Sequence, residues 1–215
     1  IRLDSDVVWI AHLGMSGRFS VYREWVPPEE NHDHIIIETD KGVTLRYNDP
    51  RRFGFMDLTT AESLPDYPLL KSIGPEPLDK DFTPEVLANC LRDRTAPIKA
   101  ALLNQRIIAG LGNIYVCEAL YGAKISPKRK ARSVQGGRAE GLHQAIVDVL
   151  LRAIQAGGSS LRDHRQPDGE FGYFQQTFLV YGRTGENCQR CGPDHQIQKI
   201  SQSGRTTFYC PNCQR

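Results

Sequence analysis

Four cysteines in the last part of the chain constrain its fold more than any other feature. They form two Cys-x2-Cys pairs separated by eighteen residues: Cys188, Cys191, Cys210 and Cys213. This is the spacing of a four-cysteine zinc site, in which two tight knuckles complete a tetrahedron of thiolates. Two disulfides or redox pairs are the alternative, but no secretion signal is visible, and two pairs together argue against a lone redox motif. The sequence therefore predicts one Zn²⁺ in a structural role, because four thiolates leave no open coordination position.

The segment between the two cysteine pairs indicates what this ribbon presents to a partner. Residues 197–208 are long enough for one β-hairpin that turns near Ser203 and Gly204. Lys199 and Arg205 belong to it, with no acidic residue between them. A small basic ribbon of this kind suits contact with phosphate groups.

Charge is divided unevenly along the 215 residues, a length that allows one or two domains. Residues 1–90 carry 9 Lys and Arg against 16 Asp and Glu, a net charge of −7, whereas residues 91–215 carry 18 against 9, a net charge of +9. This division favours two units, one of which faces a polyanion, although a solvated basic surface explains the charge alone more simply. The composition is globular, and no apolar run reaches the roughly 18 residues of a membrane span.

The pattern of apolar residues changes from strands to helices along the chain. Short β-branched and aromatic runs, separated by glycine and proline turns, predict strands at 7–10, 19–22, 35–37 and 43–47. Strands at this spacing favour an antiparallel sandwich or barrel. After a proline-rich stretch, periodicity and helix-start signals predict helices at 83–91, 96–103, 113–120 and 138–156. Residues 159–176 are polar and glycine-rich, so a long loop is expected there.

Three further motifs accompany the cysteine pairs. They are Leu13-Gly14-Met15-Ser16-Gly17, Asp49-Pro50-Arg51-Arg52-Phe53-Gly54 and Gly110-Leu111-Gly112-Asn113-Ile114-Tyr115. In this order and with the ribbon, they resemble the formamidopyrimidine-DNA glycosylase family, bacterial base-excision enzymes for oxidised purines. The resemblance covers essentially the whole chain and implies an α+β fold with DNA bound between its domains. The implied domains are an incomplete antiparallel β-sandwich at 1–75, a helix–two-turn–helix domain at 76–176 with a lesion-capping loop at 159–176, and a zinc finger at 177–215.

The resemblance also implies a reaction. A bifunctional enzyme of this family removes 8-oxoguanine or formamidopyrimidines from double-stranded DNA with an amine nucleophile and then cleaves the abasic site by β,δ-elimination. It is expected to act as a monomer in the bacterial cytoplasm, without a membrane. The family's nucleophile is the proline of an N-terminal Pro-Glu-Leu-Pro segment, assisted by a glutamate and by a lysine further along. This sequence starts at Ile1 and contains none of the three. The chain as given is therefore expected to be inactive while keeping most of its DNA-binding residues.

Three residues are implied to fill the space that a flipped base leaves. An enzyme that acts on a base inside a duplex must extrude it and fill the gap, for which apolar wedges and an arginine are suited. By resemblance, Met15 and Phe53 enter the base stack, and Arg51 meets the base opposite the lesion. Without the resemblance, Met15 and Phe53 would be assigned to a hydrophobic core and Arg51 to the solvated surface.

The remaining implied site residues contact the DNA backbone. By resemblance these are His32, Arg94, Asn113 and Arg205, and Arg205 is also linked to δ-elimination. Asn113 is expected to cap the helix that it opens, where free N–H groups favour phosphate. Lys99 is expected near the same DNA strand as Arg94. In the capping loop, residues 172–175 offer an aromatic ring and amide donors to a flipped purine.

Two other functions remain open from the sequence. One is a non-catalytic DNA-binding zinc protein, which the missing nucleophile favours. The other is the sister glycosylase for oxidised pyrimidines, against which Met15, the Arg51-Arg52-Phe53 triplet and the long capping loop argue.

Overall fold

The computed structural model describes residues 1–3, 5–159 and 172–215. The chain divides into two compact units. The first comprises Ile1–Lys71 with the described part of Ala156–Gln175, and the second comprises Ser72–Gln155 with Gln176–Arg215. Among the helices of the described ranges, none combines the length and the apolar character that crossing a membrane requires.

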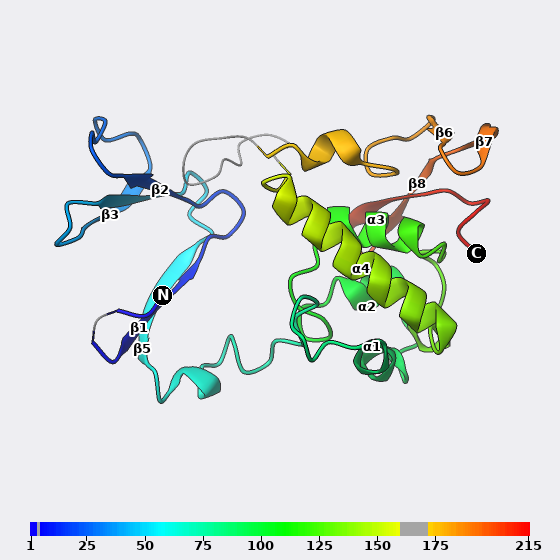
Figure 1. Cartoon of the computed structure of the whole chain (residues 1–215), viewed down its shortest axis with the longest axis horizontal. Helices are drawn as coiled ribbons and strands as arrows, with labels where there is room; N and C mark the ends of the chain where they lie inside the picture. Colours follow the sequence, from blue (N-terminus) through cyan, green and yellow to red (C-terminus); the bar gives the residue numbers. More distant parts are fainter. Residues whose placement is uncertain (4, 160–171) are drawn as a thin grey trace. The chain divides into compact units, whose positions relative to one another are not determined.

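The first unit contains two antiparallel sheets (Figure 1). Strands β1 (Val7–His12) and β5 (Phe55–Thr60) form one, and β2 (Arg18–Tyr22), β4 (Thr44–Asn48) and β3 (Asp33–Glu38) form the other in that order. Apolar side chains of both sheets line a groove of about 710 Å³. They include Trp9, Ile35, Ile37, Leu45, Met56 and Leu58. The antiparallel β-structure predicted for this region is confirmed, and a short 3-10 helix, η1 (Leu64–Asp66), follows it.

The second unit begins with a helical core that follows the predicted pattern. Its helices are α1 (Pro84–Leu91), α2 (Ile98–Leu102), α3 (Asn113–Gly122) and α4 (Gly137–Gln155), with the 3-10 helix η2 (Ala131–Ser133) between the last two. The Thr83 side chain caps α1 by accepting a hydrogen bond from the Val86 N–H at 3.3 Å, as a Thr-Pro start predicts. Apolar residues at helical spacing bury one face of each longer helix, including Leu87 and Leu91 of α1 and Leu142, Ile146 and Val149 of α4.

A small β-rich ribbon packs on the helical core. After the 3-10 helix η3 (Phe174–Thr177), it contains β6 (Asn187–Cys188), β7 (Gly192–Gln196), β8 (Gln198–Gln202) and β9 (Arg205–Tyr209). Strands β8 and β9 form the predicted hairpin, turning through Ser203 and Gly204, which both have positive φ. Strand β9 packs against α3 (Figure 1). The pairing of β6 with β7 around the first cysteine knuckle was not predicted from the sequence.

Candidate functional site

The four ribbon cysteines converge on one point. Their sulfur atoms all lie within 4.8 Å of one another. The Cys188–Cys213 and Cys191–Cys210 sulfur pairs are separated by 3.9 Å and 3.7 Å. A tetrahedral ion with Zn–S bonds of about 2.3 Å requires sulfur–sulfur edges of about 3.8 Å. The donor set and its geometry therefore fit zinc.

Hydrogen bonds distinguish Cys188 from its neighbours. Burial opposes ionisation of this thiol, but the Tyr121 hydroxyl and the N–H groups of Arg190 and Cys191 lower its pKa to about 6. At Cys213, burial and the adjacent cysteines raise the pKa. Thiolates this close repel one another, so ionisation of all four requires a cation at their centre.

Hydrogen bonds attach the β8–β9 hairpin to the helical core at Thr206 and Thr207, the two residues that follow Arg205. The Thr206 carbonyl accepts hydrogen bonds from Lys99 Nζ at 3.2 Å and from Asn113 Nδ2 at 2.9 Å, and Lys99 Nζ also donates to Thr207 Oγ1 at 2.7 Å. The side chain of Arg205 itself is exposed. Helices α2 and α3 therefore fix the backbone from which Arg205 projects.

Two expectations about the helical residues need correction. Lys99 is 0 % exposed, so it cannot meet a DNA strand at the surface, and burial lowers the pKa of its ammonium. Gly112 rather than Asn113 is the N-cap of α3, because Asn113 is already the first helical residue, and the Asn113 amide is turned towards the hairpin. Among the described residues, Asn113 Oδ1 is buried without a hydrogen-bond partner.

In the first unit, the three predicted wedge residues lie together on two loops. The Arg51 guanidinium carbon lies 4.6 Å from the centre of the Phe53 ring, and Arg51 Nη1 lies 3.4 Å from Met15 Sδ. Met15 is 75 % exposed and Phe53 is 57 % exposed. The alternative assignment of both residues to a hydrophobic core is therefore wrong.

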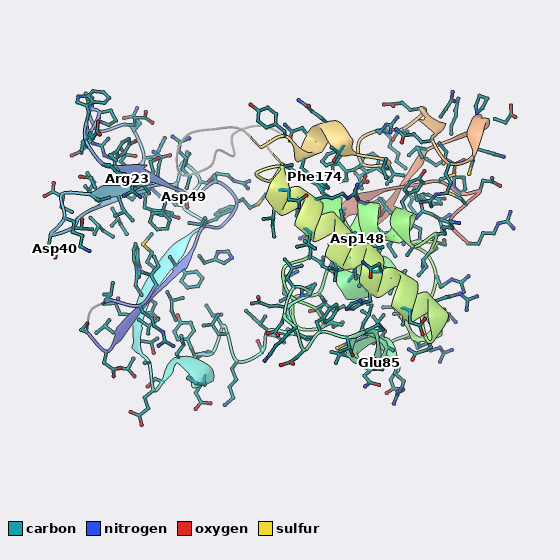
Figure 2. All side chains as sticks on the ribbon, in the orientation of Figure 1. Arg23, Asp40, Asp49, Glu85, Asp148 and Phe174 are labelled. Carbon is teal, nitrogen blue, oxygen red and sulfur yellow. The ribbon has the colours of Figure 1, made fainter. Side chains whose placement is uncertain are left out.

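A buried carboxylate joins these two loops. Asp49, which directly follows β4 (Figure 2), accepts hydrogen bonds from Ser16 Oγ at 2.5 Å, Tyr47 Oη at 3.1 Å and the Gly54 N–H at 2.9 Å. The Arg51 N–H in turn donates to Ser16 Oγ at 3.2 Å. The Ser16 hydrogen bond is the largest cause that lowers the pKa of Asp49 to about 2. Asp49 belongs to a motif quoted from the sequence, but nothing in that motif indicated this role.

The loops also approach each other closely through glycine. A Cβ atom on Gly14 would lie 2.6 Å from the Phe53 carbonyl carbon, and one on Gly54 would lie 1.8 Å from the Tyr47 hydroxyl. Gly14 also has a φ of +64°, which side-chain-bearing residues rarely adopt. These glycines allow the backbone to place Met15 beside Phe53.

Two other residues predicted to contact DNA, His32 and Arg94, have exposed side chains. His32 has a φ of 75°, and its carbonyl accepts a hydrogen bond from the Asp49 N–H at 3.1 Å, which places it next to the loop that carries Arg51. In the second unit, Arg94 Nε donates to the Cys90 carbonyl at 2.7 Å, near the end of α1.

Part of the predicted capping loop lies outside the described residues, namely 160–171. Of its tail, Tyr173 is 56 % exposed, whereas the Phe174 ring is buried. Gln175 Nε2 donates to the Gly172 carbonyl at 2.6 Å. Tyr173 is therefore the aromatic residue of this tail that a ligand could reach.

Comparison with known families assigns each part of this architecture. The formamidopyrimidine-DNA glycosylase N-terminal domain matches residues 1–56, the H2TH domain of the same enzymes matches residues 73–165, and the zinc finger found in FPG and IleRS matches residues 185–215. Together with the four-cysteine cluster, these matches define a zinc-finger DNA glycosylase of base-excision repair.

Individual relatives narrow this class further. The chain is 50 % identical over 213 residues to the formamidopyrimidine-DNA glycosylase of Ruegeria pomeroyi, covering 96 % of this chain and 75 % of that protein. It is 53 % identical over 229 residues to that of Rhodospirillum centenum, with coverage of 100 % and 79 %. The chain belongs to the formamidopyrimidine-DNA glycosylase family.

Solved structures agree with this assignment. A mutant Lactococcus lactis FPG in complex with DNA that contains Fapy-dG superposes with a TM-score of 0.86 at 40 % identity, covering 98 % of this chain and 76 % of that one. The Lactococcus lactis enzyme in complex with abasic-site DNA gives a TM-score of 0.85 at 40 % identity, with the same coverage.

Proposed function

We propose that this protein recognises oxidised purines, namely 8-oxoguanine and formamidopyrimidines, in double-stranded DNA. We further propose the reaction that the family resemblance implies, in which the oxidised base is excised and the abasic site is cleaved by β,δ-elimination. The observation that carries the proposal is the cluster of Met15, Arg51 and Phe53. Two exposed apolar side chains flank a guanidinium on loops that Asp49 holds together. This combination suits insertion into a base stack, with the arginine donating to the base that has lost its partner.

The remaining residues support contact with the DNA backbone. Arg205 projects from a hairpin that Lys99 and Asn113 hold in place, which suits a positioned phosphate contact and the proposed part in δ-elimination. The side chains of His32 and Arg94 are exposed, and we assign them to further contacts with the DNA backbone. We also propose that the protein acts as a monomer in the bacterial cytoplasm, at the nucleoid.

The metal has a structural role in this proposal. One zinc ion bound by Cys188, Cys191, Cys210 and Cys213 would close the two knuckles from which the hairpin extends. When bound, zinc supplies folding energy to the ribbon and takes no part in the reaction, because four thiolates fill its coordination sphere. The domain bounds that we propose are 1–75 for the β-domain, 76–176 for the helix–two-turn–helix domain with its capping loop at 159–176, and 177–215 for the zinc finger.

Oxidised purines are favoured over oxidised pyrimidines by two considerations. The named relatives are formamidopyrimidine-DNA glycosylases. One solved neighbour, MutM, is in complex with DNA that contains carbocyclic 8-oxo-G, at 41 % identity and a TM-score of 0.84.

The wedge is tested by binding to DNA that lacks one base. Fluorescence anisotropy would compare a duplex that contains a tetrahydrofuran abasic analogue with the same duplex fully paired. Changing Met15→Ala and Phe53→Ala together should remove most of the preference for the abasic duplex and leave affinity for the paired duplex unchanged. Trp25→Ala is the matched control, because Trp25 is 72 % exposed on the same unit but outside the cluster. Equal losses on both duplexes would refute the wedge.

A further inference from the structure

Tyr121 contacts a zinc ligand from outside the ribbon. It lies in the last turn of α3, is 2 % exposed, and places its hydroxyl oxygen 3.3 Å from Cys188 Sγ. A thiolate bound to a metal carries no proton and can only accept. In the zinc-bound protein this hydrogen bond therefore runs from the Tyr121 hydroxyl to the Cys188 sulfur.

The Tyr121 ring is clamped by the first cysteine knuckle. Arg190, which lies between Cys188 and Cys191, places its guanidinium carbon 4.3 Å from the centre of the ring. The Arg190 Nη1 atom also donates to the Tyr121 carbonyl at 2.7 Å. Two contacts from one knuckle residue hold the tyrosine in the orientation that directs its hydroxyl at Cys188.

The surroundings of this hydroxyl exclude solvent. Tyr121 and Cys188 belong to a buried cluster that also contains Cys117, Val180, Ile197 and Cys210. A buried hydroxyl needs a partner, and a thiolate is a charged acceptor for which a hydrogen bond is worth more than for a neutral one. The contact therefore gives the buried hydroxyl a hydrogen-bond partner and stabilises the thiolate. Breaking it leaves a buried thiolate with one stabilising donor fewer.

We propose that Tyr121 is an outer-shell residue of the zinc site, whose hydroxyl helps to retain the metal through the Cys188 thiolate and ties the ribbon to α3. This inference rests on the proposed zinc binding. It also attaches both ends of α3 to the ribbon, since Asn113 in its first turn donates to Thr206 in the hairpin. The knuckle and the hairpin are thereby positioned by opposite ends of one helix.

Zinc release tests the proposal. Tyr121→Phe removes only the hydroxyl, and outer-shell partners typically account for 10–100-fold in metal affinity. Transfer of zinc from the purified full chain to a chromogenic chelator should become about tenfold faster. Tyr181→Phe is the matched control: its ring packs on the same cluster and lies 4.8 Å from Phe208, and no described hydrogen bond joins its hydroxyl to a cysteine. This control should release zinc at the wild-type rate.

A spectroscopic readout separates the hydrogen bond from a general loss of packing. With Co²⁺ in place of zinc, the thiolate-to-metal charge-transfer band should shift in Tyr121→Phe but not in Tyr181→Phe. If Tyr121→Phe does not fold by circular dichroism, Arg190→Met, which releases the ring and keeps the hydroxyl, should speed release in the same direction.

The outcomes distinguish this inference from the function on which it rests. Wild-type protein without bound zinc would refute the metal site itself. Zinc-bound wild type whose release rate and cobalt spectrum are unchanged by Tyr121→Phe would overturn the role of Tyr121 alone.

Discussion

The ammonium of Lys99 donates a 2.7 Å hydrogen bond to the hydroxyl of Thr207, a residue 108 positions later in the chain. The lysine is fully buried, and its second bond reaches the Thr206 carbonyl, which adjoins Arg205. A residue expected at the DNA surface therefore acts inside the protein, where it holds the segment that carries a proposed phosphate contact.

Replacing Lys99 tests this indirect role. Lys99→Met keeps most of the side-chain volume and removes the ammonium, which leaves the buried Thr207 hydroxyl without this donor, so we also expect a loss of stability of about 1–3 kcal/mol. The hairpin loses two of its attachments, so we expect DNA affinity to fall about tenfold, or roughly 1.4 kcal/mol, together with a lower Tm. Fluorescence anisotropy and thermal unfolding measure the two effects. Lys80→Met, at an exposed lysine of the same unit, is the control, and wild-type affinity of Lys99→Met would contradict the role.

Arg205 is predicted to contact phosphate and to read no base. Each phosphate contact contributes about one unit to the slope of log affinity against log salt concentration. Arg205→Ala should therefore lower that slope by about one and weaken binding to all duplexes alike. A titration series between low and moderate salt, on lesion and undamaged duplexes, measures it. An unchanged slope, or a loss confined to one duplex, would show that Arg205 does not act through phosphate.

The Asp49 carboxylate is predicted to stabilise its two loops in a pH-dependent way. Hydrogen bonds hold its folded-state pKa at about 2, below the ordinary value of about 4. Because the folded pKa is the lower one, this stabilisation is complete above about pH 4 and is lost as the pH falls towards 2. Thermal unfolding from pH 2 to 5 should show a weaker pH dependence in Asp49→Asn than in the wild type. Asp40→Asn, at an exposed acid of the β3–β4 turn, should retain the wild-type dependence.

The covalent chemistry is predicted to need groups that residues 1–215 do not supply. The resemblance assigns it to a proline amine and a glutamate, and neither has a counterpart among these residues. A polypeptide of these 215 residues should neither excise 8-oxoguanine nor form a borohydride-trapped Schiff base on lesion DNA. One preceded by the family's N-terminal segment should do both. A trapped adduct that maps to an internal lysine of the shorter polypeptide would refute this account.

Features set by local sequence were predictable, and features set by distant contacts were not. Cysteine pairs, the Ser203–Gly204 turn and the Thr83 cap each depend on residues a few positions apart, and the structure contains all three. The burial of Lys99 depends on a strand more than one hundred residues away. Periodicity carries no information about such a partner. For the same reason, the Asn113 amide was assigned to its own helix, although its partner is Thr206.

The close approach of Gly14 and Gly54 to their neighbours limits how this surface can change. A Cβ atom at Gly14 would collide with the Phe53 backbone, and one at Gly54 would collide with the Tyr47 hydroxyl, so a substitution at either glycine would displace these loops. The side chains at Met15 and Phe53, by contrast, project into open space. In a library that varies every position of both loops, the substitutions that folded variants carry should be found mainly at Met15 and Phe53, and Gly14 and Gly54 should remain glycine. The specificity of this surface can therefore change through the side chains at Met15 and Phe53 while the backbone of the two loops stays the same.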